Sequence, residues 1–149
     1  MTQLTQDLAV RVYGDPVPQG SMTCVGFAGR HNVQPSNKDA LKTWRALVKR
    51  AGQALPVTGL AGPLGVEVTF TFARPASVPL RKRAWPAVKK ADIDKLARAV
   101  LDGLTDSQVY GDDSQVVELL ARKTYPDSPG ALDRLDQPGC IIRLYPIGG

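Results

Sequence analysis

The chain has 149 residues, which fits one compact domain, so we expect a single domain over residues 1–149. Hydrophobic residues make up 43% of the chain, which is enough for a core and excludes a disordered composition. The formal net charge of +5 and the sequence pI of about 9.4 favour an anionic partner such as nucleic acid.

Two residue types exclude further classes of protein. Cys24 and Cys140 are the only cysteines, so there is neither a disulfide framework nor a CxxC zinc motif, and we expect free thiols in a reducing compartment. His31 is the only histidine and is expected at the surface of a loop, so an enzyme built on this chain must use carboxylates and metal instead. No apolar run approaches the ~20 residues of a membrane span, and the first residues do not resemble a signal peptide, which predicts a cytoplasmic protein without membrane contact.

The first part of the chain predicts two strands and a helix. Residues 8–13 alternate weakly and predict a strand; a Gly/Pro turn at 14–21 and a short strand around 22–27 follow. A helix capped by Ser36 or Asn37 is expected to run to about Leu55. Its apolar residues recur at spacings of three and four: Leu41, Trp44, Leu47, Val48, Ala51 and Leu55. Its other face is basic: Lys38, Lys42, Arg45, Lys49 and Arg50.

The second part predicts a sheet and another helix. Residues 66–72 alternate strictly and predict a half-buried strand after a Gly/Pro linker at 56–65. A helix is expected over about 92–104, and strands over 115–124 and 140–145, with a polar insertion at 126–138. One apolar stripe is predicted on that helix: Ile93, Leu96, Val100, Leu101 and Leu104. The order of elements predicts an α+β fold, a small mixed β-sheet covered by two main helices.

Two pairs of acids flank the second helix. Asp92 and Asp94 stand at its start, and Asp112 and Asp113 stand in the turn before the next strand. Taken alone, the first pair is ordinary helix capping and the second an ordinary turn. Taken together, they predict a hard-cation site over residues 92–113, provided that residues 105–111 double back toward the Asp92 end. Ligation by oxygen alone favours Mg²⁺, or Mn²⁺, over Zn²⁺.

Each cation near these acids has two possible roles, one structural and one functional. Arg98 is either an i,i+4 partner of Asp94 or a group that holds a scissile phosphate. Lys123, at a strand end, is either solvated or part of the site. Residues 74–90 predict an exposed basic loop, whose cations surround Trp85 as they would in a nucleic-acid contact. The candidate DNA-binding residues are Arg81, Lys82, Arg83, Trp85, Lys89 and Lys90.

These motifs together resemble the RusA family of phage and prophage-type Holliday junction resolvases. The matching segments are the early turn at 14–20, Asp92-Ile93-Asp94-Lys95-Leu96, Arg98, Leu101-Asp102-Gly103-Leu104, Asp112-Asp113-Ser114-Gln115-Val116-Val117 and Lys123. The chain departs from the family pattern at Lys95, where Asn is common, and at Arg98, where the best-known member has an essential lysine.

The resemblance implies a RusA-like homodimer that cuts four-way DNA junctions by paired symmetric nicks, in a bacterial or phage-infected cell. It implies a metal site made of Asp92, Asp94 and Asp113, with Asp112 and Lys123 beside it, Arg98 in catalysis, Mg²⁺ as cofactor and no small-molecule cofactor. Hydrolysis would leave 5′-phosphate and 3′-hydroxyl ends, in DNA recombination and repair. Two alternatives stay open: a DNA-binding accessory protein without turnover, and a metal-dependent nuclease acting on flaps or RNA.

Overall fold

The structure is a computed structural model that describes residues 2–20, 26–27, 30–31, 35–78, 87–88, 91–129 and 133–148. The elements follow in the order β1 Thr2–Gln3, β2 Leu8–Tyr13, β3 Gly26–Phe27, β4 Arg30–His31, α1 Pro35–Ala54, β5 Leu60–Ala61, β6 Leu64–Thr71, α2 Ile93–Ser107, the 3₁₀ turn η2 Asp113–Gln115, β7 Val116–Thr124 and β8 Gly139–Pro146. In the described part of the chain no helix is long and apolar enough to cross a membrane.

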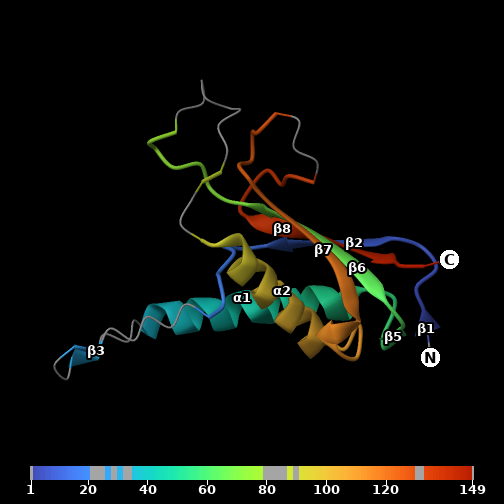
Figure 1. The fold of residues 1–149 in the computed structure, drawn as a ribbon. Helices are drawn as coiled ribbons and strands as arrows, with labels where there is room; N and C mark the ends of the chain where they lie inside the picture. Colours follow the sequence, from blue (N-terminus) through green and yellow to red (C-terminus); the bar gives the residue numbers. More distant parts are fainter. Residues whose placement is uncertain are drawn as a thin grey trace.

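Four strands form the central sheet, in the order β2-β8-β6-β7 (Figure 1). The β2–β8 and β6–β8 pairs are antiparallel, whereas β6 and β7 are parallel. The sheet is therefore mixed, and the predicted α+β class is confirmed. Two short pairs lie outside it, β1 with β5 and β3 with β4.

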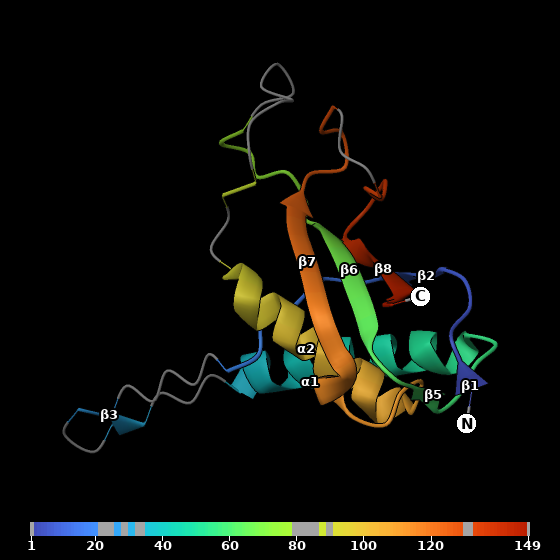
Figure 2. The same ribbon diagram turned by 45° about the vertical axis from the view of Figure 1, so that its right-hand side comes forward.

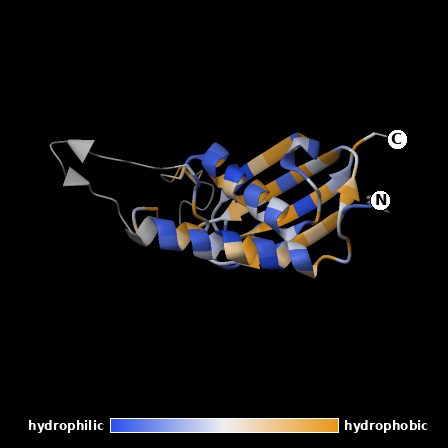
Figure 3. Ribbon diagram, turned by 90° about the horizontal axis from the view of Figure 1, so that it is seen from below, coloured by the Kyte–Doolittle hydropathy of each residue, from blue (hydrophilic) through white to orange (hydrophobic). Residues whose placement is uncertain are grey.

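Both helices pack on one face of this sheet (Figure 1). The inward residues of β6 are Val66, Val68 and Phe70, all without exposed surface, which is the outcome predicted from their alternation. From α1, Trp44 and Val48 complete the core under the sheet. Hydrophilic residues cover the outward turns of the helices, as Figure 3 shows, so one face of each helix is in contact with solvent.

Small residues let the two helices approach closely. A Cβ atom on Gly103 would lie 2.7 Å from Val48 Cγ1, and one on Gly52 would lie 2.4 Å from Ser107 Oγ. Both distances are shorter than side-chain contacts allow, so glycine is required at each crossing point. This close contact fixes α2 against α1 and therefore fixes the direction in which its polar face points.

The connection from β6 to β7 determines where the acids lie. Parallel neighbours need a crossover, and α2 is that crossover, running back from the end of β6 to the start of β7 (Figure 2). The helix has 15 residues, a length of about 22 Å at ~1.5 Å per residue. The residues directly after α2 therefore lie about a helix length from the residues directly before it.

The predicted elements differ from the structure in their bounds. The second helix runs to Ser107 rather than ending near residue 104, and the predicted linker contains β5 and the start of β6. The predicted strand at 22–27 is described only at Gly26–Phe27, where β3 forms.

Burial also differs from the prediction at two elements. Ile93, expected on the buried stripe of α2, is 39% exposed, whereas Ala97 and Ala99 are buried. The second face of β6, expected in solvent, is buried at Thr69 and Thr71 and only partly exposed at Glu67. Part of this cover comes from the polar insertion, where Leu135 N donates to Thr71 Oγ1 at 3.0 Å.

Candidate active site

The first acid pair lies at the start of α2 and is exposed. Asp92 is the N-cap residue, although its side chain makes no capping hydrogen bond, and Asp94 lies in the first turn. Lys95 Nζ lies 3.4 Å from Asp92 Oδ2. Within the described residues no ion pair joins Asp94 to Arg98, so the predicted i,i+4 pair does not account for Arg98.

The second acid pair belongs to η2. The Asp112 carboxylate accepts a hydrogen bond from Ser114 N at 3.0 Å, while Gln115 Oε1 accepts from Asp112 N at 3.1 Å, and the two form a capping box. Gln115 also donates through Nε2 to the carbonyls of Leu60 and Gly62, at 2.8 and 3.0 Å. Asp112 and Gln115 therefore shape the turn, and Asp113 remains exposed beside them.

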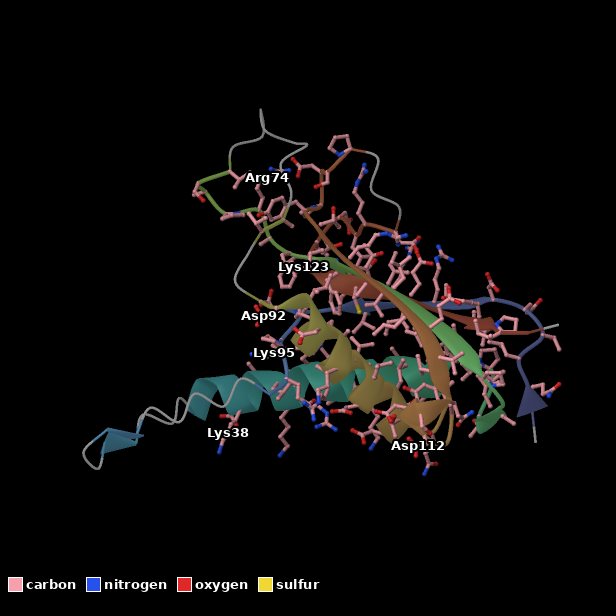
Figure 4. All side chains as sticks on the ribbon, in the orientation of Figure 1. Lys38, Arg74, Asp92, Lys95, Asp112 and Lys123 are labelled. Atoms are coloured by element: carbon pink, nitrogen blue, oxygen red, sulfur yellow. The ribbon has the colours of Figure 1, made fainter. Side chains whose placement is uncertain are left out.

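The structure does not bring the two acid pairs together in one chain. Asp92 and Asp112 lie at opposite ends of α2 (Figure 4), and no three acids, histidines or cysteines of the described residues form a group that could hold a metal ion. The expected doubling back of residues 105–111 is wrong. Gln108 ends α2 in the left-handed conformation, and the buried Val109 and Tyr110 then pair with Leu60, so the chain enters β7 at the far end of the helix.

A different set of charges surrounds Asp113. A hydrogen bond with the Asp112 carboxyl, slight burial and the negative charges of Asp112 and Asp102 raise the pKa of Asp113, while the positive charge of Arg98 opposes the rise. The pKa of Asp112 is lowered, first by the backbone hydrogen bond from Ser114. Arg98 therefore lies near enough to act on the carboxyl of Asp113, from a position midway along α2.

The residues at 94, 98 and 102 share one face of α2, because they follow each other at intervals of four. This face has an acid near each end and Arg98 between them. We call it the charged face of α2. It includes Asp102, which belongs to the family pattern but is not among the predicted site residues.

The early Gly/Pro turn lies across this charged face. Gln19 N donates to the Lys95 carbonyl at 3.0 Å, and Gln19 Nε2 donates to Asp102 Oδ2. A Cβ atom on Gly20, whose φ is +88°, would lie 3.8 Å from Arg98 Nη1. The sequence contains a signal for this contact, since the turn is part of the same family pattern as the helix, but it gives no direct indication that the two touch.

Lys123 joins the end of β7 to the start of α2. Its Nζ donates to the Ala91 carbonyl at 3.0 Å, and the side chain is half-buried. This hydrogen bond ties Lys123 to the start of α2, although its side chain is still partly exposed. Lys123 lies near the Asp92 end of α2 (Figure 4), where it positions the first acid pair through the backbone.

The predicted DNA contacts lie outside the described residues. These are Arg81, Lys82, Arg83, Trp85, Lys89 and Lys90. The described basic surface is on α1, whose exposed cations are Lys38, Lys42, Lys49 and Arg50. Arg45 of the same helix bonds Asp106 of α2 at 2.8 Å, so the α1 cations adjoin the helix that presents the charged face.

Comparisons with known proteins agree with this pattern. The model of a family described as endodeoxyribonuclease RusA matches residues 14–132, a range that contains the Gly/Pro turn, both helices and both acid pairs. The chain is also similar to the uncharacterized protein YqaN of Bacillus subtilis (strain 168), with 33% identity over 127 residues, which cover 79% of this chain and 87% of YqaN.

Proposed function

The chain belongs to the RusA family of endodeoxyribonucleases, enzymes that hydrolyse DNA, and from this membership we propose that it resolves four-way DNA junctions. It would do so by paired symmetric nicks that leave 5′-phosphate and 3′-hydroxyl ends, during recombination and repair. The observation that carries the proposal is the charged face of α2, where Arg98 lies between two groups of acids and beside a basic helix.

Each part of this surface matches one requirement of the reaction. The exposed cations of α1 suit the phosphates of a DNA arm, because most of the affinity for DNA comes from such contacts. Arg98 has a permanent charge and a planar set of donors, which suits a phosphate oxygen that gains negative charge. In our proposal Arg98 holds the scissile phosphate and the α1 cations hold the flanking backbone.

We propose Mg²⁺ as the cofactor, with Mn²⁺ able to replace it, but the described residues of one chain do not fit the ion. Oxygen ligands are the right chemistry, yet Asp92 and Asp94 are separated from Asp113 by the length of α2. When bound, Mg²⁺ would supply a Lewis acid for phosphodiester hydrolysis. We therefore propose that three acids converge only in a homodimer, with the acids of the two ends supplied by different copies.

A homodimer also suits the substrate. A four-way junction has two equivalent strands to cut, and a two-fold axis would present one site to each. Two α2 helices lying antiparallel about such an axis would bring the Asp92 end of one beside the Asp113 end of the other. The same arrangement would generate two sites for every pair of chains.

The test is cleavage of a labelled four-way junction by the purified protein, with and without Mg²⁺, beside linear duplex, flap and RNA substrates of the same sequence. We expect paired nicks in the junction, only with the metal and at symmetric positions. Binding without cleavage at any Mg²⁺ or Mn²⁺ concentration would indicate an accessory DNA-binding protein instead. Preferential cutting of the flap or the RNA would replace the substrate in our proposal.

A further inference from the structure

Arg98 has an acidic residue four positions away in each direction along α2. Asp94 comes before it and Asp102 after it, and residues at this spacing are neighbours on the surface of a helix. Opposite charges at this spacing usually stabilise a helix by pairing. In the described part of the chain, however, no ion pair includes Arg98, and its side chain is exposed. The guanidinium is therefore available to a ligand, although two carboxylates are its neighbours on the helix.

The Asp102 carboxylate is held instead by the Gly/Pro turn. Gln19 Nε2 donates a hydrogen bond to Asp102 Oδ2, and both side chains are partly buried. A partly buried hydrogen bond to a charged group contributes more, net, than an exposed i,i+4 ion pair. The order of the charges also disfavours a pair with Arg98, since a helix favours the acid on the N-terminal side of its basic partner. Asp102 therefore stays with Gln19 rather than with Arg98.

The turn is anchored to the helix through its backbone. Gln19 N donates to the Lys95 carbonyl at 3.0 Å, near the start of α2, and the chain after β2 can be followed beside the first turns of this helix in Figure 1. The next residue, Gly20, has a φ of +88°, which other residues adopt only with strain. A Cβ atom on Gly20 would lie 3.8 Å from Arg98 Nη1. The turn therefore passes beside Arg98 and contacts the helix both before it, at Lys95, and after it, at Asp102.

The second polar atom of the Gln19 side chain indicates what this residue contributes. Gln19 Oε1 is buried and has no hydrogen-bond partner among the described residues. A buried acceptor without a partner is destabilising, and an apolar side chain of similar length would avoid that loss. The amide cannot be turned over, because Oε1 would then face the Asp102 carboxylate. What glutamine supplies here, and an apolar residue would not, is the Nε2 donor to Asp102.

We infer that Gln19 is a positioning residue, which holds Asp102 away from Arg98 and so keeps the guanidinium free for the scissile phosphate. The inference rests on the proposed function, in which Arg98 holds that phosphate. Gln19 touches no reacting atom in this arrangement. Without its donor, the Asp102 carboxylate would be released to pair with Arg98, and the phosphate would have to displace it.

The first test needs no DNA. In the free protein labelled with ¹⁵N, the Nε–H signal of Arg98 is the one that Arg98→Lys lacks. An ion pair protects this proton from exchange with water, so exchange should slow about two- to fivefold in Gln19→Ala, a factor that corresponds to an exposed ion pair. It should return to the wild-type rate when Asp102→Ala is added. Unchanged exchange in Gln19→Ala would overturn the inference, and so would slow exchange that persists without Asp102.

The second test is the single-turnover rate of junction cleavage at saturating protein and Mg²⁺. We expect Gln19→Ala to cut about two- to fivefold more slowly than wild type. In an Asp102→Ala background the same substitution should no longer slow the reaction, because no carboxylate remains at position 102 to compete for Arg98. A purely structural role for Gln19 gives a different result, since the loss of rate would then persist in that background.

Two further variants control for folding. Gln19→Met keeps the approximate length of the side chain and the backbone bond to Lys95 but removes the donor, so it should behave as Gln19→Ala does. Gln6→Ala makes the same chemical change at an exposed position before β2 and should match wild type in both measurements. Wild-type behaviour of Gln19→Met, or an equal loss in Gln6→Ala, would contradict the positioning role.

The two proposals can fail separately. If exchange at Arg98 changes as expected while no form of the protein cuts a junction, only the proposed function is contradicted. If wild type cuts junctions while exchange at Arg98 is the same in every variant, only the positioning role of Gln19 is contradicted.

Discussion

Gln19 donates a hydrogen bond from its side-chain amide to the carboxylate of Asp102, across 83 positions of sequence. The bond joins the Gly/Pro turn after β2 to the charged face of α2, and the backbone of Gln19 makes a second bond to Lys95 beside it. Gln19 Oε1 is buried without a partner among the described residues, so the Asp102 contact is what holds this side chain. The early turn is therefore part of the candidate site.

A double-mutant cycle measures this contact. Gln19→Ala should lower the free energy of unfolding by about 1–2 kcal/mol, since it removes a partly buried hydrogen bond to a charged group. Asp102→Ala should lower it too, and the double variant by less than the sum of the two, with a coupling energy of about 1 kcal/mol. Urea unfolding at neutral pH gives the three values. Additivity within ~0.3 kcal/mol would show that the two residues do not interact.

The three acids should be needed for cleavage but not for binding. Asp92→Asn, Asp94→Asn and Asp113→Asn should each slow junction cleavage by ~10²–10³ or more, because each removes a charge proposed to hold the metal. Binding of the junction should persist or tighten, as negative charge near the phosphates falls. Single-turnover cleavage and gel-shift titration measure the two effects. Asp7→Asn, at an exposed acid remote from α2 in sequence, is the control, and full activity in any two of the site variants would reject the assignment.

Arg98 allows a test of charge against geometry. If it holds the scissile phosphate, Arg98→Ala should reduce the single-turnover rate by ~10²–10³, and Arg98→Lys should recover part of the loss because the charge is kept. The folding stability of both variants should stay near that of wild type, since no ion pair to Asp94 forms in the described structure. A rate for Arg98→Ala within about threefold of wild type would remove this residue from the mechanism.

The two basic surfaces can be separated by salt. Neutralising Arg81, Lys82, Arg83, Lys89 and Lys90 should weaken junction binding and reduce the slope of log affinity against log salt by about 0.9 for each phosphate that the protein no longer neutralises. A second variant that neutralises Lys38, Lys42, Lys49 and Arg50 on α1 is the matched comparison. If neutralising one of these two sets of cations leaves the slope unchanged, that set does not contact the phosphates of the junction.

Stability at acid pH should depend on Asp133. Its side chain is 13% exposed and bonds Arg143, and this hydrogen bond holds the pKa of Asp133 below its usual value. A lowered pKa in the folded state stabilises the protein above the ordinary aspartate range of about 3.9, and this stabilisation is lost as the pH falls through the folded value. Asp133→Asn keeps the left-handed backbone, at a φ of +62°, but removes the charge.

We therefore expect Asp133→Asn to cost roughly 1 kcal/mol at neutral pH, since Arg143 is still partly in solvent. The variant and wild type should converge only as the pH falls through the lowered pKa of Asp133 in the folded protein. Denaturant unfolding of wild type and variant at a series of pH values between 7 and 2 measures the difference in their free energies of unfolding. Parallel curves at all pH values would show that the ion pair does not contribute.

The sequence predicted the elements of this fold better than their ends and their arrangement. Strict alternation identified β6 because its apolar residues all face the helices, but it could not show that Thr69 and Thr71 are covered from the other side. The stripe on α2 included Ile93, which hydropathy alone cannot distinguish from a core residue, although the helix begins beyond the edge of the core. β1 and β5 pair over two residues each, too few to leave a periodic pattern.

The candidate site was predicted by residue type but not by position. The acids were selected because two pairs flank one helix, and Arg98 and the Gly/Pro turn because they match the pattern of a known family. Their distances depend on whether β7 runs parallel or antiparallel to β6, which no local pattern specifies. Since the strands are parallel, α2 must span the sheet, and the doubling back that would join the acids is impossible within one chain.

The length of the crossover helix has a consequence for the control of an activity that can harm the cell. If the acids at its two ends act together only when two copies meet, a lone chain is inert toward DNA, and the yield of active sites rises with the square of concentration when chains are scarce. A newly made or dilute chain, still monomeric, could then bind intact duplex DNA without cutting it. The separation of the two acid groups would thus act as a safeguard for the genome, built into the topology of the sheet rather than supplied by an inhibitor.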